Sequence, residues 1–181
     1  MDNHELHGIL SSLLGDLFLG VFASDQLSTI PKKIQLLAYF VVNTHPAHLP
    51  GEHWLVLPVE QDGLGTFFDS YGFSPEFEYY PKTILNFLKE RCSEIHYQDD
   101  QLQSLTSDHC GHHCVLFLCH KASGISLKHI LSKYHKNVSM DAMVYNFVKK
   151  YRNCIKCHDL YFTQINCTLK CLTTDCEICF E

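Results

Sequence analysis

The sequence has no long uninterrupted hydrophobic run and no cluster of lysines or arginines at its N-terminus. The apolar stretch near that end is interrupted by Ser11, Ser12, Gly15 and Asp16, and acidic and histidine residues precede it where a signal peptide has basic ones. We therefore expect neither a secretory signal nor a membrane span. Internal repeats and low-complexity segments are also absent, so the 181 residues, 46% of them hydrophobic, predict one compact soluble domain.

Cysteine, in contrast, is abundant, with ten residues in the chain. Without an export signal, such cysteines are more often thiols, metal ligands or a nucleophile than a disulfide framework, which indicates a reducing compartment. Six of the ten fall in a Cys-rich C-terminal tail, residues 153–181, where the composition changes abruptly. Two Cys-x₂-Cys pairs eighteen residues apart are typical of a four-cysteine zinc site, with reduced thiols or disulfides as the alternatives. The candidate zinc ligands are Cys154, Cys157, Cys167, Cys171, Cys176, Cys179 and His158.

Charge is unevenly distributed along a chain whose net charge is -6. Residues 1–110 carry a net charge of -10, residues 121–156 carry +7 and residues 157–181 carry -3. A cationic segment of this kind suits a polyanion or an acidic partner. The alternative is a solvated helical surface, since eight cations in this segment need not share one face.

Apolar patterns predict an α+β fold with a central mixed or antiparallel sheet flanked by helices. Residues 36–43 form a continuous apolar run that is typical of a buried strand. Residues 53–59 and 65–73 predict the two strands of a hairpin. A helical N-terminal stretch is expected before them. Helices with the matching apolar spacing are predicted after them, over residues 82–92, 110–123 and 140–151.

Cys110 is the candidate nucleophile. It precedes Gly111 and an apolar helical run, so we expect its sulfur at a helix N-terminus, where unpaired N–H groups and the dipole stabilise a thiolate. Thiol hydrolysis also needs a base, a carboxylate that orients it, and donors for the oxyanion. His53 and Asp69 lie on the two predicted hairpin strands, about 5 Å apart in such a pair, and are candidates for base and carboxylate. Gln103 offers an amide donor seven residues before the cysteine, whose own backbone N–H is a second donor.

Each of these residues also has a plainer interpretation as a structural histidine, a turn aspartate, a polar loop glutamine or a buried thiol. Three other histidines compete for the role of base, namely His109, His112 and His113. They flank the cysteine so closely in sequence that their side chains are not expected to face it. Cys114 and Cys119 are expected to be small buried hydrophobes. The order His, Asp, Gln, Cys is what favours a catalytic site.

The sequence resembles the adenain family of adenovirus maturation proteases. That family belongs to the adenain and Ulp1 clan and has relatives in adenovirus-like viruses and Polinton-type elements. The resemblance covers about residues 17–152 and rests on an ordered combination rather than on any single motif. Its central motifs are G-E-H-W at 51–54, F-F-D-S-Y-G-F-S at 67–74, Gln103, and C-G-H-H-C-V-L-F-L at 110–118. Its flanking motifs are F-L-G at 18–20, V-V-N-T at 41–44 and Y-N-F-V-K-K-Y at 145–151.

The resemblance implies a cysteine endopeptidase domain at residues 1–152 with a papain-like active site, and places the tail at 153–181 outside it. Cys110 would be the nucleophile, His53 the general base and then acid, Asp69 the residue that orients His53, and Gln103 part of the oxyanion hole. Many members have glutamate in place of the aspartate. Trp54 would line the substrate cleft. The implied substrates are viral capsid and core precursors, cut beside small residues such as Gly-Gly in the virion and host nucleus.

The family chemistry requires no cofactor, but two activators are implied by the resemblance. Cys92 matches the position at which an activating capsid-derived peptide can be disulfide-linked; an ordinary free thiol is the alternative. DNA is the other activator, and the basic segment 121–156 is its candidate site in this otherwise acidic chain. No membrane partner is expected.

Two other functions compete with the maturation protease. D-H-C-G-H-H-C at 108–114 also resembles Ulp1-type enzymes that remove ubiquitin-like modifiers. The seven-residue spacing of Gln103 and Cys110 favours the adenain side. A non-catalytic zinc and nucleic-acid binding protein is the alternative from another class; the joint presence of all four candidate site residues argues against it.

Overall fold

The computed structural model describes residues 1–32, 37–60, 63–132 and 140–158, with only the backbone described for 153–158. Two short 3₁₀ turns, at Gly15–Leu17 and Leu27–Thr29, lie among the longer elements. The helices are α1 (Asn3–Leu14), α2 (Lys82–Arg91), α3 (Cys110–Ala122), α4 (Leu127–Ser132) and α5 (Met140–His158). The strands are β1 (Phe18–Ala23), β2 (Tyr39–Asn43), β3 (Trp54–Val56), β4 (Leu64–Phe67) and β5 (Glu94–Tyr97).

The strands form a mixed sheet. β1 pairs in parallel with β2, and β2 pairs antiparallel with β3. β4 and β5 form a second, parallel pair. Reciprocal 3.0 Å backbone hydrogen bonds between Val56 and Phe68 connect the two groups, so the hairpin that carries the candidate base and carboxylate lies at the centre.

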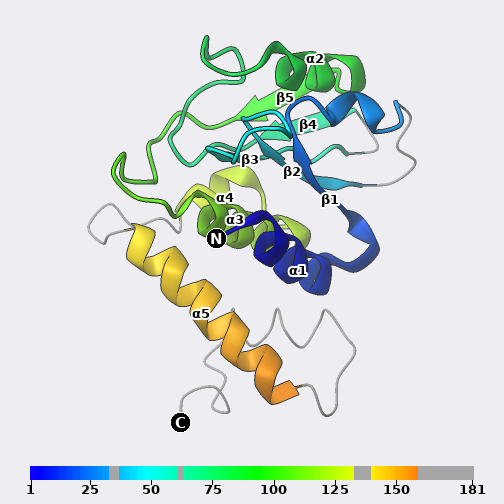
Figure 1. Ribbon diagram of the computed structural model, residues 1–181. Coiled ribbons are helices and arrows are strands. Elements are labelled where there is room, and N and C mark those ends of the chain that lie inside the picture. The colour runs from blue at the N-terminus through cyan, green and yellow to red at the C-terminus, as the bar shows by residue number, and fades with distance from the viewer. Residues whose placement is uncertain (33–36, 61–62, 133–139, 159–181) are drawn as a thin grey trace.

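The sheet separates two hydrophobic cores (Figure 1). Alternate residues of β2 point to opposite sides, as the strand period requires: Val41 belongs to the core that includes residues of α1, α3 and α5, whereas Phe40 belongs to the core that includes residues of α2. Phe68 and Phe117 stack face to face with ring centroids 4.1 Å apart. This stack fixes α3 against the end of the hairpin.

The α+β prediction with a mixed sheet and flanking helices is confirmed. The buried strand and the helices α2, α3 and α5 lie where they were expected, and β3 and β4 pair as the expected hairpin. The second hairpin strand ends earlier than predicted, because the chain turns after Phe68, so Asp69 follows the strand instead of lying on it. Helix α4 was not predicted. The expected helical N-terminal stretch is α1, which ends at Leu14 before Gly15, whose φ is 54°, and the strand β1 that follows it was not predicted. The short, mostly exposed strand β5 had no apolar pattern that would predict it.

Helix α5 continues six residues past the expected domain boundary at 152. The proposed zinc ligands of the tail lie outside the residues whose side chains are described. Within the described part of the chain, no helix is both long and apolar enough to cross a membrane.

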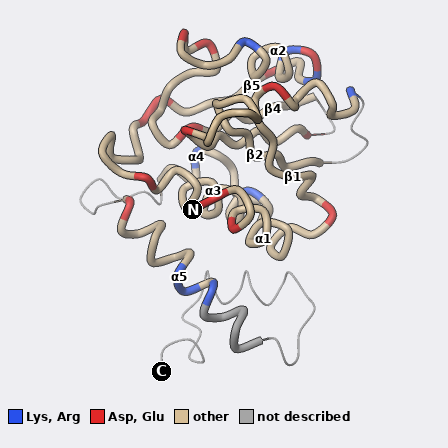
Figure 2. Tube along the Cα trace, in the orientation of Figure 1, with Lys and Arg blue, Asp and Glu red and all other residues tan. Residues whose placement is uncertain are grey.

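Charged residues of both signs are dispersed along the chain (Figure 2). In the expected DNA-binding segment, Lys121 pairs with Glu60 at 2.8 Å, and Arg152 pairs with Glu5. These two cations are therefore partly neutralised by acidic residues of the same chain. The DNA interaction stays a prediction.

Candidate active site

Cys110 is the first residue of α3 and is 9% exposed. The ten residues from Cys110 to Cys119 are all buried, as expected of a helix that is apolar enough to be covered on every face. Its sulfur therefore lies at the N-terminal end of a thirteen-residue helix, where the helix dipole favours a negative charge. This is the placement that the sequence predicted.

His53 immediately precedes β3 and is held there by the loop before it. The side-chain oxygen of Asn43 accepts hydrogen bonds from the backbone N–H groups of His45 (2.9 Å) and Glu52 (3.1 Å). Gly51 has a φ of 92° and lies so close to the Asn43 amide that a Cβ would be 2.9 Å from its nitrogen. The G-E-H-W motif therefore needs its glycine to bring the histidine to the start of β3.

The structure brings His53 together with both Asp69 and Cys110. His53 Nε2 lies 2.6 Å from Asp69 Oδ1, and the imidazole also hydrogen-bonds the Cys110 side chain. Because Nε2 serves the carboxylate, Nδ1 is the nitrogen available to the thiol. Tyr71 stacks on the imidazole with ring centroids 4.6 Å apart and restricts its rotation. An imidazole thus lies between a carboxylate and a thiol. Thiol hydrolysis requires this geometry of its base, its orienting acid and its nucleophile.

Asp69 is fully buried, and its carboxylate accepts four hydrogen bonds. Oδ1 accepts from His53 and from the Tyr71 backbone N–H at 3.0 Å. Oδ2 accepts from the Phe73 N–H at 2.9 Å and from the Tyr80 hydroxyl at 2.7 Å. Neither Tyr71 nor Tyr80 was among the predicted site residues. Tyr71 lies within the F-F-D-S-Y-G-F-S motif at 67–74 and could have been found from it, whereas Tyr80 lies in no motif.

Electrostatics in the site favour a charged pair. Burial alone would lower the pKa of His53, but hydrogen bonds and negative charge from Asp69 and Cys110 raise it from 6.5 to about 9. Burial pushes the pKa of Asp69 upward, yet the hydrogen bonds from His53, Tyr80 and Tyr71 lower it below its ordinary value. At neutral pH the site therefore holds an imidazolium between the Asp69 carboxylate and the Cys110 side chain.

Gln103 is 1% exposed, and its amide is fixed by three hydrogen bonds. Its Oε1 accepts from the Ser70 hydroxyl at 2.6 Å. Its Nε2 donates to the Ser107 carbonyl oxygen at 2.9 Å and, at a longer 3.3 Å, to the Tyr71 hydroxyl oxygen. The longer bond is the one that an oxyanion would replace most readily.

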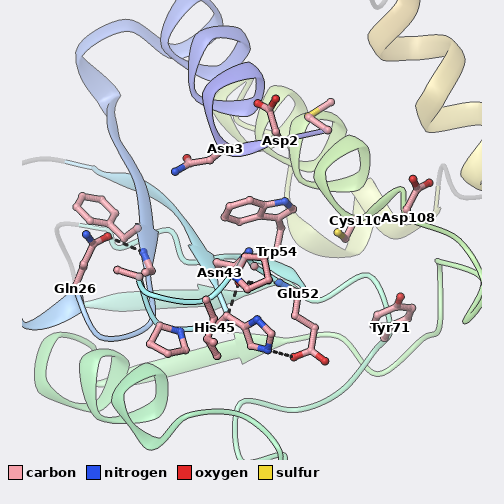
Figure 3. Close-up of a pocket in the computed structure, with 18 of the residues that line it drawn as sticks. Asp2, Asn3, Gln26, Asn43, His45, Glu52, Trp54, Tyr71, Asp108 and Cys110 are labelled. Atoms are coloured by element: carbon pink, nitrogen blue, oxygen red, sulfur yellow. Dashed lines mark hydrogen bonds and ion pairs between the residues drawn. The ribbon is translucent and has the colours of Figure 1, made fainter.

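A cavity of about 710 Å³ opens beside Cys110. Trp54, Tyr71 and Ser107 contribute to its walls, so the stacking partner of His53 and the carbonyl partner of Gln103 both face the same space as the nucleophile. Figure 3 shows Cys110 between Trp54, Tyr71 and Asp108 at one end of this cavity. Trp54 lies where a residue lining a substrate cleft was expected.

The competing histidines face elsewhere. The rings of His109 and His112 pack against Tyr145 of α5 at centroid distances of 5.8 and 5.7 Å. His113 Nε2 lies 3.1 Å from Asp141 Oδ1. This geometry agrees with the expectation that the three histidines next to Cys110 in the sequence do not act as its base.

The remaining described thiols differ from Cys110 in setting. Cys114 and Cys119 are buried as expected, and burial raises the pKa of both, that of Cys119 to about 12. Cys92 follows α2 and packs against Gly65, away from the cavity. Partial burial raises its pKa. Among the described residues, no group of three or more histidine, cysteine or acidic side chains is arranged to hold a metal ion.

The fold has counterparts among solved structures. The ASFV pS273R protease superposes with a TM-score of 0.53 at 14% identity, over 80% of this chain and 66% of that one. The central domain of the uncharacterised Lpg1148 protein from Legionella pneumophila superposes with a TM-score of 0.51 at 12% identity, over 86% of this chain and 98% of that one. The chain thus spans just under two thirds of the viral protease. No protein-family model and no curated sequence matches it. The fold accordingly resembles that of the ASFV pS273R protease.

Proposed function

We propose that the protein is a cysteine endopeptidase with Cys110 as nucleophile, His53 as general base and acid, Asp69 as the residue orienting His53, and Gln103 as an oxyanion donor. The proposal rests mainly on one observation: Asp69 contacts His53, and His53 contacts Cys110, at the edge of a cavity. The likeness of the fold to the ASFV pS273R protease supports it.

The geometry supports a two-step mechanism. The Cys110 thiolate attacks the scissile carbonyl carbon, and the resulting oxyanion accepts hydrogen bonds from the Cys110 N–H and Gln103 Nε2. The His53 imidazolium gives its proton to the leaving amine as the C–N bond breaks, which leaves a thioester. His53 then takes a proton from water, which attacks the thioester and releases the acid and the thiol.

The proposed substrates are viral structural precursor proteins cut beside small residues such as Gly-Gly. This proposal rests on the motif resemblance to the adenain family, together with the protease fold. A peptide cofactor at Cys92 and a DNA cofactor at the basic segment are proposals of the same origin.

Iodoacetamide labelling near pH 6 tests the nucleophile. An ordinary thiol with a pKa of about 8.5 is almost entirely protonated at that pH, so only a thiolate held by an imidazolium reacts rapidly. We expect selective alkylation of Cys110 that is lost in His53→Ala, with Cys92 as the internal comparison because it is partly exposed and its pKa is raised. Equal, slow labelling of all cysteines would contradict the proposal.

A cleavage assay tests the substrate class. A Gly-Gly peptide from a capsid-type precursor and a fusion to a ubiquitin-like modifier are offered to the same enzyme preparation, with Cys110→Ala as the blank. Preferential cleavage of the peptide supports a maturation protease. Preferential release of the modifier would instead assign a Ulp1-type activity to the same residues.

A further inference from the structure

Asp141, in the first turn of α5, binds two separate parts of the active-site framework. Its Oδ1 lies 3.1 Å from His113 Nε2 on α3. Its Oδ2 accepts a hydrogen bond from the Ser104 backbone N–H, also at 3.1 Å. One carboxylate of α5 thus connects the helix that starts at Cys110 with the turn that follows Gln103.

This connection spans the two donors of the proposed oxyanion hole. Gln103 and Cys110 are seven residues apart, and the turn between them is held by a 3.1 Å hydrogen bond from the Ser107 N–H to the Ser104 carbonyl oxygen. The Ser107 carbonyl in turn accepts from Gln103 Nε2 at 2.9 Å. A displacement of Ser104 would therefore move the acceptor that orients the Gln103 amide.

The contact between Asp141 and His113 is a hydrogen bond between a carboxylate and a neutral imidazole. His113 is fully buried, and this burial lowers its pKa even though Asp141 acts in the opposite direction. Its Nε2–H then donates to Asp141, whose own pKa is lowered by hydrogen bonds from His113 and the Ser104 N–H despite partial burial. The contact is therefore present across the neutral range.

We propose that Asp141 is a positioning residue that sets the separation of Gln103 Nε2 and the Cys110 N–H, so that both reach one oxyanion. The inference rests on the proposed function and adds α5 to the machinery. Oxyanion donors act only when they are held at hydrogen-bond distance from the developing charge. A rigid link between two donors keeps both of them at that distance.

Two reactions of Cys110 separate positioning from general structural damage. In alkylation by iodoacetamide the sulfur displaces iodide and no oxyanion forms. In acylation by p-nitrophenyl acetate the sulfur attacks the ester carbonyl, an oxyanion forms, and p-nitrophenolate leaves. We expect Asp141→Ala to lower the acylation rate roughly 10- to 100-fold while the alkylation rate stays within about twofold of wild type.

Matched variants complete the test. Asn146→Ala, at an exposed position of the same helix, is expected to change neither rate. Asp141→Asn keeps an acceptor for the Ser104 N–H and is expected to recover part of the acylation rate, which also covers the case in which the alanine variant does not fold. The double variant with Gln103→Ala is expected to acylate no more slowly than Gln103→Ala alone, because Asp141 acts through Gln103.

The outcomes distinguish this inference from the function on which it rests. If wild-type Cys110 shows no His53-dependent alkylation, the proposed function fails and this inference fails with it. If that alkylation is present but Asp141→Ala and Asp141→Asn acylate at the wild-type rate, only the role of Asp141 is overturned. Equal losses in both reactions would likewise overturn it, because they indicate damage to the nucleophile itself.

Discussion

At the scale of single residues, the Asp69 carboxylate is the most constrained group of the site. Each of its oxygens has two hydrogen-bond donors, and a carboxylate offers about four acceptor positions. It therefore has no rotational freedom in which to follow the imidazole. In the proposed mechanism it holds His53 in one orientation, and the backbone N–H groups of Tyr71 and Phe73 fix this short acid from behind.

Removal of the nucleophile or the base is expected to abolish activity. Cys110→Ala and His53→Ala should each reduce kcat/KM for peptide cleavage to the blank level, because the two residues act as a unit. Asp69→Ala should cost less, since it removes orientation and not a reacting group. His129→Ala, at an exposed histidine of α4, is the control and should leave kcat/KM unchanged. Substantial turnover by either of the first two variants would refute the assignment.

The raised pKa of His53 predicts the alkaline limit of activity. The group is charged below a pKa of about 9 and loses its proton above it, so the imidazolium that would protonate the leaving amine in the proposed mechanism disappears as the pH rises through that value. Asp69→Asn removes a charge that raises the pKa, and should therefore move the alkaline limb of the kcat/KM profile to lower pH. A limb that stays in place would show that another group controls it.

Only those residues of the candidate site that follow an ordered spacing in the sequence could be predicted. His53, Asp69, Gln103 and Cys110 follow the order that the chemistry requires, and a hairpin and a helix start suffice to bring three of them together. Asp141 was not predictable, because its contacts depend on how α5 packs across α3, and no local pattern encodes that packing.

At the scale of elements, the turn after β4 determines how Asp69 is held. Gly72 donates its backbone N–H to the Asp69 carbonyl oxygen at 3.0 Å and has a φ of 80°. A Cβ at this position would lie 2.8 Å from the Asp100 backbone. The two backbone donors to the Asp69 carboxylate flank this glycine, so a distortion of the turn reaches the carboxylate directly.

Gly72→Ala is therefore expected to lower both stability and activity. The positive φ alone costs an alanine about 1 kcal/mol, and the clash with Asp100 adds to that cost. Gly124 is a matched control, because it has a φ of 75° with open space around it. Denaturant unfolding and kcat/KM should show a larger loss of both quantities for Gly72→Ala than for Gly124→Ala. Equal losses would mean that the contact with Asp100 carries no energy.

The elements themselves were predictable where burial follows one clear period. β2 is buried at every residue and α3 at nearly every one, so uninterrupted apolar stretches identified both. β1 was not separated from the helical N-terminal stretch, because its apolar residues continue those of α1 and its pairing with β2 is a long-range contact. β5 is polar and exposed, and its pairing with β4 alone makes it a strand.

At the scale of the whole molecule, the candidate site lies within a limited part of the chain. The residues with a role in the proposed reaction, His53, Asp69, Gln103, Cys110 and Asp141, all fall between residues 53 and 141. We therefore expect a chain ending at His158 to retain the melting temperature and the Cys110 alkylation rate of the full chain. A drop in either quantity would show that residues 159–181 support the rest of the chain.

The active site is divided between two consecutive stretches of chain. The hairpin and the turn after it supply His53 and Asp69, whereas the segment from Gln103 to Asp141 supplies the nucleophile, the oxyanion donors and their link. The stretch between them includes the exposed residues 99–101. Under the proposed function, a chain divided there would give two inactive fragments, each with half of the candidate site, and their joint activity would report when two proteins fused to those fragments meet.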